Sequence, residues 1–443
     1  MLRFAPSPTG DMHIGNLRVA IFNYMLSKLR NESLLIRIED TDKERNIEGK
    51  DKEFLDILGL FGIEHETVIN QSSHIKYHRA MALQLIHEKK AFNCFCTTQT
   101  LDADQKASEA AKKTYSYSGV CETLHPEETI DNLSPFTVRI RKPNKAIIVK
   151  DLIQGEMSFD TNEVDSFVIL HQDKNPTYNF ACAIDDMISD ISLVVRGEDQ
   201  MSNTPKQIFI RKTLGYDKEI EYAHVPIILN REGKKMSKHD DGSSVKHLLE
   251  MGFLPEAIIN YLILMGNETP SEIFSMKEAL AWFSLDTISK SSAHFDMDKL
   301  KFINHTHLKN LDAVELSRYV GFADQDIGEL ARVYMQECNT LVDLRSKIEP
   351  IFKAKNIPEE FMDSAKTLKE VISKAPYIED YNEFEKYVMS ESKLEGKNFF
   401  TSLRLLLTGV EKGPDMTAIY PPLKNFIGKI VTEELIALSS EQK

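Results

Sequence analysis

The sequence predicts an α/β protein in which a parallel sheet is interrupted by an inserted α+β module and followed by a helical C-terminal half. Three observations predict this fold. The first forty residues give strand, turn, helix and strand signals in turn, and residues 94–175 alternate short β-like runs with polar loops. From about residue 246, apolar residues recur at helical spacing almost to the end. With 443 residues, the chain is also too long for one ordinary domain.

The opening segment has the pattern of a βαβ unit. The apolar run from Leu2 to Ala5 stops at a cluster of turn formers, residues 6–10. Helical spacing then begins at Gly15, and residues 33–38 have the composition of a buried strand. Such a unit opens a nucleotide-binding parallel sheet. Residues 49–63 predict the next helix, which is amphipathic.

The middle of the chain predicts strands of two kinds. Short β-like runs of the insertion lie at residues 137–141, 146–149 and 164–170. Strands typical of the parallel sheet return at residues 191–196 and 226–229. The helical half that follows has breaks at Gly266, Pro350 and Pro414.

The charge balance does not decide whether the chain binds nucleic acid. The 54 basic and 68 acidic residues give a net charge of −14, which taken alone argues against a nucleic-acid partner. Local basic clusters could still form one positive face: residues 139–145, 211–212 and 231–238 each contain several Lys or Arg. No apolar run approaches the length of a membrane span, so we expect no membrane partner and a cytoplasmic location. The five cysteines are too few and too uneven for a disulfide framework.

The first motif that predicts chemistry runs from Pro6 to Asn16, with the sequence PSPTGDMHIGN. It is a Gly/Pro turn that leaves a strand and opens a helix, with His13 and Gly15 at the first turn. A helix N-terminus favours an anion, Gly15 lets the backbone approach a ligand, and His13 could donate to a phosphate oxygen. By itself, a histidine at this position is more often an ordinary helix cap.

The second motif is the lysine loop, residues 234–239 (KKMSKH), which follows the apolar run 225–229. Clustered lysines in a loop suit a polyphosphate whose charge grows in the transition state. Alone, such a string is usually a solvated loop. The two motifs in this order, about two hundred residues apart, are much more specific than either one.

Together the two motifs resemble the paired signatures of class I aminoacyl-tRNA synthetases, and further strings narrow the resemblance to glutamyl-tRNA synthetases. These strings span almost the whole chain: RFAPSPTG at 3–10, RIEDTD at 37–42, PTYNFA at 176–181, VRGED at 195–199, AHFD at 293–296 with Lys299-Leu300, and LLTG at 406–409.

The resemblance implies a domain order. A Rossmann-type nucleotidyltransferase catalytic domain would occupy residues 1–90 and 176–230, interrupted by an acceptor-end insertion at 91–175. A stem-contact segment with the lysine loop would occupy 231–310, followed by an all-α anticodon-binding region at 311–443. Members of the family suggest a monomer.

The resemblance also implies which residues hold glutamate. Arg3 and Tyr178 would bind its side-chain carboxylate, Arg196 its α-carboxylate, and Glu39 with Ser7 its ammonium, with Ala5 beside them. A ligand with two carboxylates and one ammonium requires two cations and one carboxylate, which agrees with this set. Charge-assisted pairs are worth roughly 1.5–3 kcal/mol each. Alternatively, Arg3 and Glu39 form a buried ion pair between neighbouring strands.

For the nucleotide, the resemblance implies ATP with Mg²⁺. The ATP-binding positions would be Thr9, Gly10, His13, Gly15, Asp199, Lys235, Ser237 and Lys238. The catalytic group among them would be His13, Gly15, Lys235 and Lys238, which stabilise phosphoryl charge. Glutamate would be activated as glutamyl-adenylate and then transferred to the 3′-terminal ribose of tRNA-Glu, tRNA-Gln or both. Enzymes of this family generally need tRNA before they activate the amino acid.

The sequence departs from the family pattern at two positions. Asn16 stands where the first motif has a second histidine, and His239 stands where the lysine loop has arginine or serine. Asparagine keeps a donor and histidine can take a charge, so we expect tuned rather than abolished activity.

Three cysteines in the insertion predict a metal site. Cys94, Cys96 and Cys121 have the spacing of three ligands of a tetrahedral Zn²⁺. Some glutamyl-type synthetases and their shortened paralogues have such a site, completed by Tyr or His; Tyr117 matches the tyrosine position, and His125 is the chemically easier ligand. Three ordinary cysteines remain the alternative. Cys182 and Cys338 have apolar surroundings and are expected in the core.

Three other functions fit part of the pattern. A truncated paralogue that glutamylates a tRNA base lacks the helical C-terminal region present here. A small-molecule adenylate-forming ligase shares the phosphate motifs but not the glutamate-site residues. A non-catalytic tRNA-binding or regulatory homologue is disfavoured by the intact His13, Lys235, Arg3 and Arg196.

Overall fold

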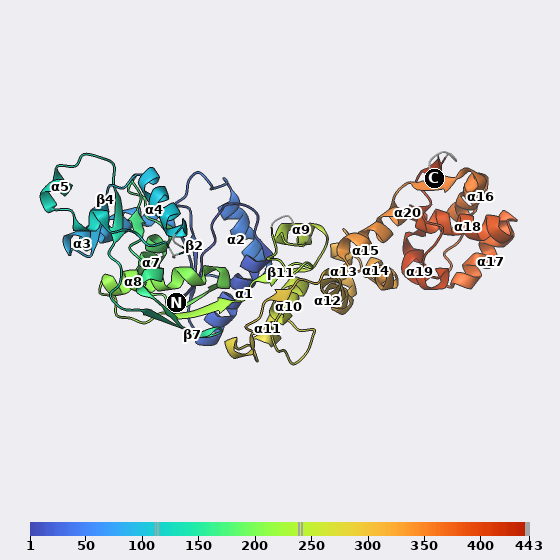
Figure 1. The fold of residues 1–443 in the computed structure, drawn as a ribbon. Helices are drawn as coiled ribbons and strands as arrows, with labels where there is room; N and C mark the ends of the chain where they lie inside the picture. The colour runs from blue at the N-terminus through green and yellow to red at the C-terminus, as the bar shows by residue number, and fades with distance from the viewer. Residues whose placement is uncertain (111, 113–114, 238–239, 241, 439–443) are drawn as a thin grey trace. The chain divides into compact units, whose positions relative to one another are not determined.

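The computed structural model describes residues 1–110, 112, 115–237, 240 and 242–438 (Figure 1). The chain divides into two compact units. The first contains residues 1–246 and 262–295, and the second contains residues 247–261 and 296–443. Each unit is described by itself.

A seven-stranded sheet forms the centre of the first unit. Its order is β3 (Thr67–Asn70), β2 (Leu34–Ile38), β1 (Leu2–Phe4), β9 (Leu193–Gly197), β10 (Glu221–Val225), β6 (Ile147–Asp151) and β7 (Gly155–Phe159). All neighbouring pairs are parallel except β6 and β7. Every residue of β1 and β2 is buried, as expected of a parallel sheet covered on both faces. The predicted parallel α/β fold is confirmed.

The helices next to this sheet are α1 (Ile14–Arg30), α2 (Lys50–Leu60), α3 (Ile75–His87), α7 (Tyr178–Ile188) and α8 (Thr204–Thr213). α1 packs against β1 and β9. It ends where Asn31 adopts a left-handed conformation (φ 52°), with Lys28 and Arg30 in the last turn, where cations favour the helix dipole.

One face of the sheet is unusual because it carries buried arginines. Leu35 of β2 and Val194 of β9 pack with Ile208 of α8. Since side chains alternate along a strand, Arg37 and Arg196, two positions further on, point to the same side. Arg3 is the register partner of Leu35 and joins them. The strand register therefore brings three arginines together beneath α7 and α8.

The strands between residues 91 and 170 divide between two sheets. β4 (Ala91–Cys94), β5 (Thr137–Ile140) and β8 (Val168–Leu170) form a separate antiparallel sheet, accompanied by α4 (Thr98–Ala110) and α5 (Pro126–Ile130). β6 and β7, by contrast, extend the seven-stranded sheet, although the sequence places them within the insertion. The strand predicted at 164–170 begins later, because Asp160 and Glu163 form a capping box that starts α6 (Thr161–Val164).

β10 was not predicted as a separate strand. Glu221 and His224 interrupt its apolar pattern; Glu221 is partly exposed, whereas His224 is buried with the rest of the strand. The end of the predicted strand 226–229 forms β11 (Ile228–Leu229), which pairs with β12 (Ala293–His294).

The remaining chain is mostly helical. The helices are α9 (Val245–Glu250), α10 (Pro255–Leu264), α11 (Met276–Ala279), α12 (Met297–Asn310), α13 (Ala313–Tyr319), α14 (Gln325–Tyr334), α15 (Leu341–Ile348), α16 (Glu359–Lys374), α17 (Tyr381–Ser392), α18 (Gly396–Thr408), α19 (Met416–Leu423) and α20 (Ile427–Ile430). The C-terminal region is not purely helical, because β13 (Lys355–Pro358) and β14 (Leu435–Leu438) form a short parallel pair. None of the helices in the described ranges is long and apolar enough to cross a membrane.

Candidate active site

A cavity of about 630 Å³ lies at the C-terminal ends of β1 and β9. In open α/β sheets, ligands bind where two neighbouring strands send their connections in opposite directions, and β1 and β9 are such a pair. The cavity brings together twelve of the residues singled out from the sequence: Arg3, Ala5, Ser7, Thr9, His13, Gly15, Glu39, Tyr178, Arg196, Asp199, Lys235 and Ser237. Gly10 is not among its lining residues, and Lys238 and His239 lie outside the described residues.

A buried charge network, made of Arg3, Asp186, Arg37 and Glu39, forms one side of this site. Arg3 Nε lies 3.3 Å from Asp186 Oδ1, and Arg37 Nη1 lies 2.5 Å from the same oxygen. Arg37 Nη2 then lies 3.4 Å from Glu39 Oε1. The alternative of a direct Arg3–Glu39 ion pair is therefore wrong: Asp186 and Arg37 stand between the two residues. The strand register causes this, because Arg37 points to the same face as Arg3 and occupies the intervening space.

Electrostatics keep the network ionised. Burial opposes a charge on Asp186, but Arg37 and Arg3 outweigh it and lower the pKa of this carboxyl to about 2. Two guanidinium groups and two carboxylates compensate one another, which is how buried charges are normally accommodated. The network thus fixes Arg3 and Glu39 in place before any ligand arrives.

The Glu39 carboxylate receives two further hydrogen bonds. The Ser7 hydroxyl donates to Oε2 at 3.5 Å, and the Cys182 thiol donates to Oε1 at 3.1 Å. Burial raises the pKa of Cys182 well above its usual range, so the sulfur keeps its proton and remains a donor. Cys182 is buried, as the sequence predicts, and it also contacts this acid.

The neighbouring acid, Asp185, has a different set of partners. It accepts hydrogen bonds from Gln71 Nε2 at 2.8 Å, and its other oxygen lies 2.8 Å from His78 Nε2 and 2.9 Å from His74 Nδ1. Sequence reasoning missed both acids of the Asp185–Asp186 pair. The available signal was two adjacent carboxylates within the otherwise apolar run FACAIDDMI of α7.

Arg196, on the neighbouring strand β9, also lines the cavity and has no acidic partner among the described residues. Its guanidinium donates to Thr204 Oγ1 at 2.7 Å, Gln207 Oε1 at 3.1 Å and His224 Nε2 at 3.2 Å. Because all three acceptors are neutral at this contact, the positive charge of Arg196 stays uncompensated. That is the electrostatic condition for binding an anion.

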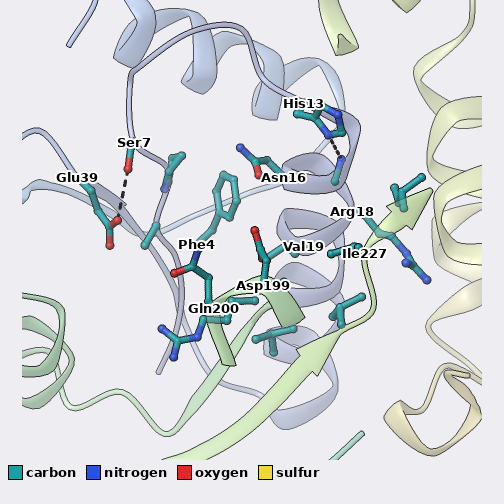
Figure 2. A pocket seen from close by; sticks show the side chains of 18 of the residues that line it. Phe4, Ser7, His13, Asn16, Arg18, Val19, Glu39, Asp199, Gln200 and Ile227 are labelled. Atoms are coloured by element: carbon teal, nitrogen blue, oxygen red, sulfur yellow. Dashed lines mark hydrogen bonds between the residues drawn. The ribbon is translucent and has the colours of Figure 1, made fainter. Parts of the chain in front are cut away.

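The opposite end of the cavity contains His13 and Lys235. Gly15 N–H donates to His13 Nδ1 at 3.0 Å, so the ring proton of neutral His13 resides on Nε2. A Cβ at Gly15 would lie 3.3 Å from the same ring, a tight contact that would require the ring to shift by a few tenths of an ångström. Figure 2 shows His13 at one end of the pocket and the hydrogen-bonded Ser7 and Glu39 at the other, with Asn16 between them and Asp199 lower in the view.

Lys235 is far more exposed than the arginines. Its ammonium is held 2.8 Å from Asp199 Oδ2, and 59% of its side chain is accessible. The following residue, Met236, is buried and bonds the backbone of Ile228, which fixes the start of the loop. Other lining residues that the sequence did not single out as ligands are Asn16, Arg18, Arg45 and Gln200.

The three predicted cysteines of the insertion converge in the structure. The sulfur atoms of Cys94, Cys96 and Cys121 lie within 4.8 Å of one another. The Tyr117 hydroxyl lies 3.5 Å from two of them, Cys94 and Cys96. Burial opposes the thiolate of Cys94, but hydrogen bonding to Tyr117 and the charge of Arg139 lower its pKa to about 7. His125 is exposed beside Glu127 and is not part of this group.

Comparisons with known proteins agree with this geometry. Residues 1–302 match the family model described as tRNA synthetases class I (E and Q), catalytic domain. Glutamate–tRNA ligase 2 of Sulfurimonas denitrificans is 62% identical over 97% of this chain and 100% of its own length. Glutamate–tRNA ligase 1 of Nitratiruptor is 54% identical with the same coverage of both chains.

Solved structures give the same result at lower identity. A glutamate tRNA ligase from Elizabethkingia meningosepticum, crystallised in complex with its amino acid, superposes with a TM-score of 0.79 at 26% identity, covering 97% of this chain and 98% of that one. The glutamate–tRNA synthetase of Elizabethkingia anophelis gives 0.76 with the same identity and coverage. The chain therefore belongs to the class I tRNA synthetases for glutamate and glutamine and, over nearly its full length, to the glutamate–tRNA ligases.

Proposed function

We propose that this chain activates glutamate with ATP and transfers the glutamyl group to the 3′-terminal ribose of a tRNA. The observation that carries the proposal is the distribution of charge around one cavity. Two fixed arginines and one fixed carboxylate lie at one end, and a histidine donor and a lysine lie at the other. Such a site matches glutamate at the first end and the phosphates of ATP at the second.

At the amino-acid end, Arg3 and Tyr178 bind the side-chain carboxylate and Arg196 binds the α-carboxylate. Glu39 and Ser7 bind the ammonium, and Ala5 lies beside the ligand. Glutamine would present an amide NH₂ to Arg3, and two donors would then face each other. A site whose fixed donors point at a ligand oxygen rejects an analogue that places a donor there, because both donors are then left without an acceptor.

At the phosphate end, His13 donates through Nε2, and Lys235 exchanges Asp199 for a phosphate oxygen. The α-carboxylate of glutamate forms a bond to the α-phosphorus as the bond to pyrophosphate breaks. His13 and Lys235 stabilise the charge that develops, together with Lys238, while Thr9, Gly10, Gly15 and Ser237 contact the nucleotide. Mg²⁺ accompanies ATP and neutralises part of the phosphate charge when it is bound.

The remaining segments are proposed to contact tRNA. Residues 91–175 would bind the acceptor end, 231–310 the stem and 311–443 the anticodon. The partner is tRNA-Glu, tRNA-Gln or both, and the enzyme acts as a monomer.

Cys94, Cys96 and Cys121, with Tyr117, would hold Zn²⁺. Three thiols and a phenol oxygen within reach of one point fit a tetrahedral ion, and Zn²⁺ there would fix the loop between β4 and β5. Metal analysis of the purified protein should give one zinc per chain, and the triple Cys→Ser variant none. Protein without zinc, purified in the absence of chelators, would contradict the site.

The charging reaction itself tests the function. Purified enzyme with ATP and Mg²⁺ should attach glutamate to tRNA-Glu, tRNA-Gln or both, assayed side by side, and should not attach glutamine. The ratio of the two products assigns the tRNA. Failure to charge either tRNA, with a protein that melts cooperatively, would overturn the proposal.

A further inference from the structure

Arg196 uses only part of its hydrogen-bonding capacity within the protein. A guanidinium has five N–H donors, and three of them are occupied by Thr204, Gln207 and His224. One N–H on each terminal nitrogen remains, and a guanidinium can bind both oxygens of a carboxylate through such a pair. Arg196 lines the cavity and is 7% exposed. The contacts of Arg196 with Thr204, Gln207 and His224 therefore decide in which direction its two remaining N–H groups point.

The contact with His224 requires one particular tautomer. Arg196 Nε is a donor, so His224 Nε2 has to accept, and the ring proton has to reside on Nδ1. Asp151 imposes this arrangement, because its Oδ2 lies 2.6 Å from Nδ1 of the fully buried His224. The Thr204 hydroxyl accepts from Arg196 Nη2 and lies 3.0 Å from Nε2, where a hydrogen bond that it donates shares the single lone pair of Nε2 with Arg196. A proton on Nε2 would instead face the N–H of Arg196, donor against donor.

Asp151 is itself fixed. Its carboxylate accepts from the backbone N–H groups of Ile153 at 2.9 Å, Gln154 at 2.8 Å and His224 at 3.0 Å. It comes from β6, a strand that the sequence assigns to the insertion, and β6 pairs with β10. His224 in turn is the register partner of Arg196 in the neighbouring strand. Three adjacent strands thus place Asp151, His224 and Arg196 in line.

We propose that His224, with its tautomer fixed by Asp151, is a positioning residue that aims Arg196 at the α-carboxylate of the amino acid. The proposal rests on the α-carboxylate role given to Arg196 above. A neutral histidine holds the guanidinium in place and leaves its positive charge uncompensated. A carboxylate in the same position would neutralise that charge. Burial lowers the pKa of His224, which favours this neutral form. Through Asp151, the strand β6 thereby contributes to the positioning of Arg196 at the amino-acid site.

Two substitutions of His224 test the roles of its two ring nitrogens separately. The amide of His224→Asn reaches the position of Nδ1, so it keeps the contact with Asp151 and loses the acceptor for Arg196. The longer His224→Gln places its amide oxygen near Nε2 and keeps that acceptor. We expect H224N to raise KM for glutamate about tenfold or more, since hydrogen bonds to charged groups have roughly this worth. H224Q should stay within about threefold, and KM for ATP should not change in either variant.

The outcomes distinguish this inference from the proposed function. If Arg196→Ala leaves KM for glutamate unchanged, the α-carboxylate assignment itself fails. If R196A raises KM but H224N does not, only the positioning role of His224 is overturned. Equal losses in H224N and H224Q, with KM for ATP also raised, indicate a structural role and overturn it as well.

A measurement on the wild-type enzyme tests the tautomer of His224 directly. In ¹⁵N spectra of histidine-labelled protein, His224 should show a protonated Nδ1 and an unprotonated Nε2, with the signal assigned by its absence in H224Q. The opposite tautomer, or a doubly protonated ring at neutral pH, would contradict the proposal.

Discussion

The two compact units of this chain bury different kinds of side chains. Among the described residues, the buried charged groups of the first unit are Arg3, Arg18, Arg37, Glu39, Arg139, Asp151, Asp185, Asp186, Arg196 and Arg211. In the second unit, within the same described ranges, the corresponding group is Lys355. Burying a charge costs free energy unless it is paired. Four of the ten buried charged residues described in the first unit, Arg3, Arg18, Glu39 and Arg196, line the cavity.

The two units also satisfy their buried charges differently. Lys355 donates to the backbone carbonyls of Pro350, Ile351 and Lys353, which closes a turn before β13. Asp186 instead joins two arginines, one of which, Arg3, lines the cavity. A buried charge in the second unit thus has a local structural role, whereas one in the first unit orients a group at the site.

The largest effect is expected from breaking the buried charge network. Asp186→Asn removes the acid that Arg3 and Arg37 share and leaves two buried cations facing a neutral amide. We expect a loss of about 3–5 kcal/mol in the free energy of unfolding, measured by urea denaturation, and weaker glutamate binding in the folded fraction. Asp190→Asn is the matched control, because Asp190 is exposed and its pair with Lys218 lies at the surface. If D186N and D190N were equally stable, the buried charge network would not stabilise the first unit more than a surface ion pair does.

The same network predicts an acid-dependent loss of stability. The pKa of Asp186 is about 2 in the folded protein, below its usual value of 3.8. Its contribution is therefore present above about pH 4 and is lost as the pH falls toward 2. Unfolding free energies measured between pH 5 and 2 should fall less steeply in D186N than in the wild type. If the unfolding free energies of D186N and the wild type fell in parallel with pH, Asp186 would not be the cause of the acid-dependent loss of stability.

Substitution of Lys235, an exposed charge of the site, should lower activity without lowering stability. Lys235→Ala should lower kcat by about 10²–10³-fold, the usual loss when one donor to a developing charge is removed. Its stability should match the wild type because the side chain is largely exposed. Lys234→Ala is the control: Lys234 is also exposed and pairs with Glu232, so charging should be unaffected. A stability loss in K235A, or equal kcat losses in both variants, would count against this assignment.

Lys355 should affect stability without affecting the active site. Burial lowers its pKa to about 8, below the usual 10.5. The unfolded chain therefore binds this proton more tightly, and stability should rise from pH 8 toward 10.5. The rise should be absent in Lys355→Met, followed by circular dichroism in urea, while KM for glutamate stays unchanged. A changed KM for glutamate in K355M would show that the buried charge of the second unit also affects the site, which would contradict the difference drawn between the two units.

Much of the fold was predictable because its signals are local. Apolar periodicity predicted the first strand, helix and strand to within one or two residues, and the helical half from about residue 246. β10 was missed because His224 and Glu221 interrupt its apolar pattern. His224 has its partners on β6 and α8, and Glu221 pairs with Arg30 of α1. β13 and β14 were missed because residues 355 and 435 pair across a long sequence separation.

The sequence by itself determined which chemical groups are candidates for the site: the histidine and glycine at the first helix, the lysine loop, the arginines and the three cysteines. These groups occur in short motifs, whose meaning depends on residue type and local spacing. Only the tertiary structure decided that Arg3 reaches Glu39 through Asp186 and Arg37, and that Asp151 sets the tautomer of the histidine behind Arg196. Those contacts depend on strand register and on helix packing between residues far apart in the chain, and no local pattern encodes them.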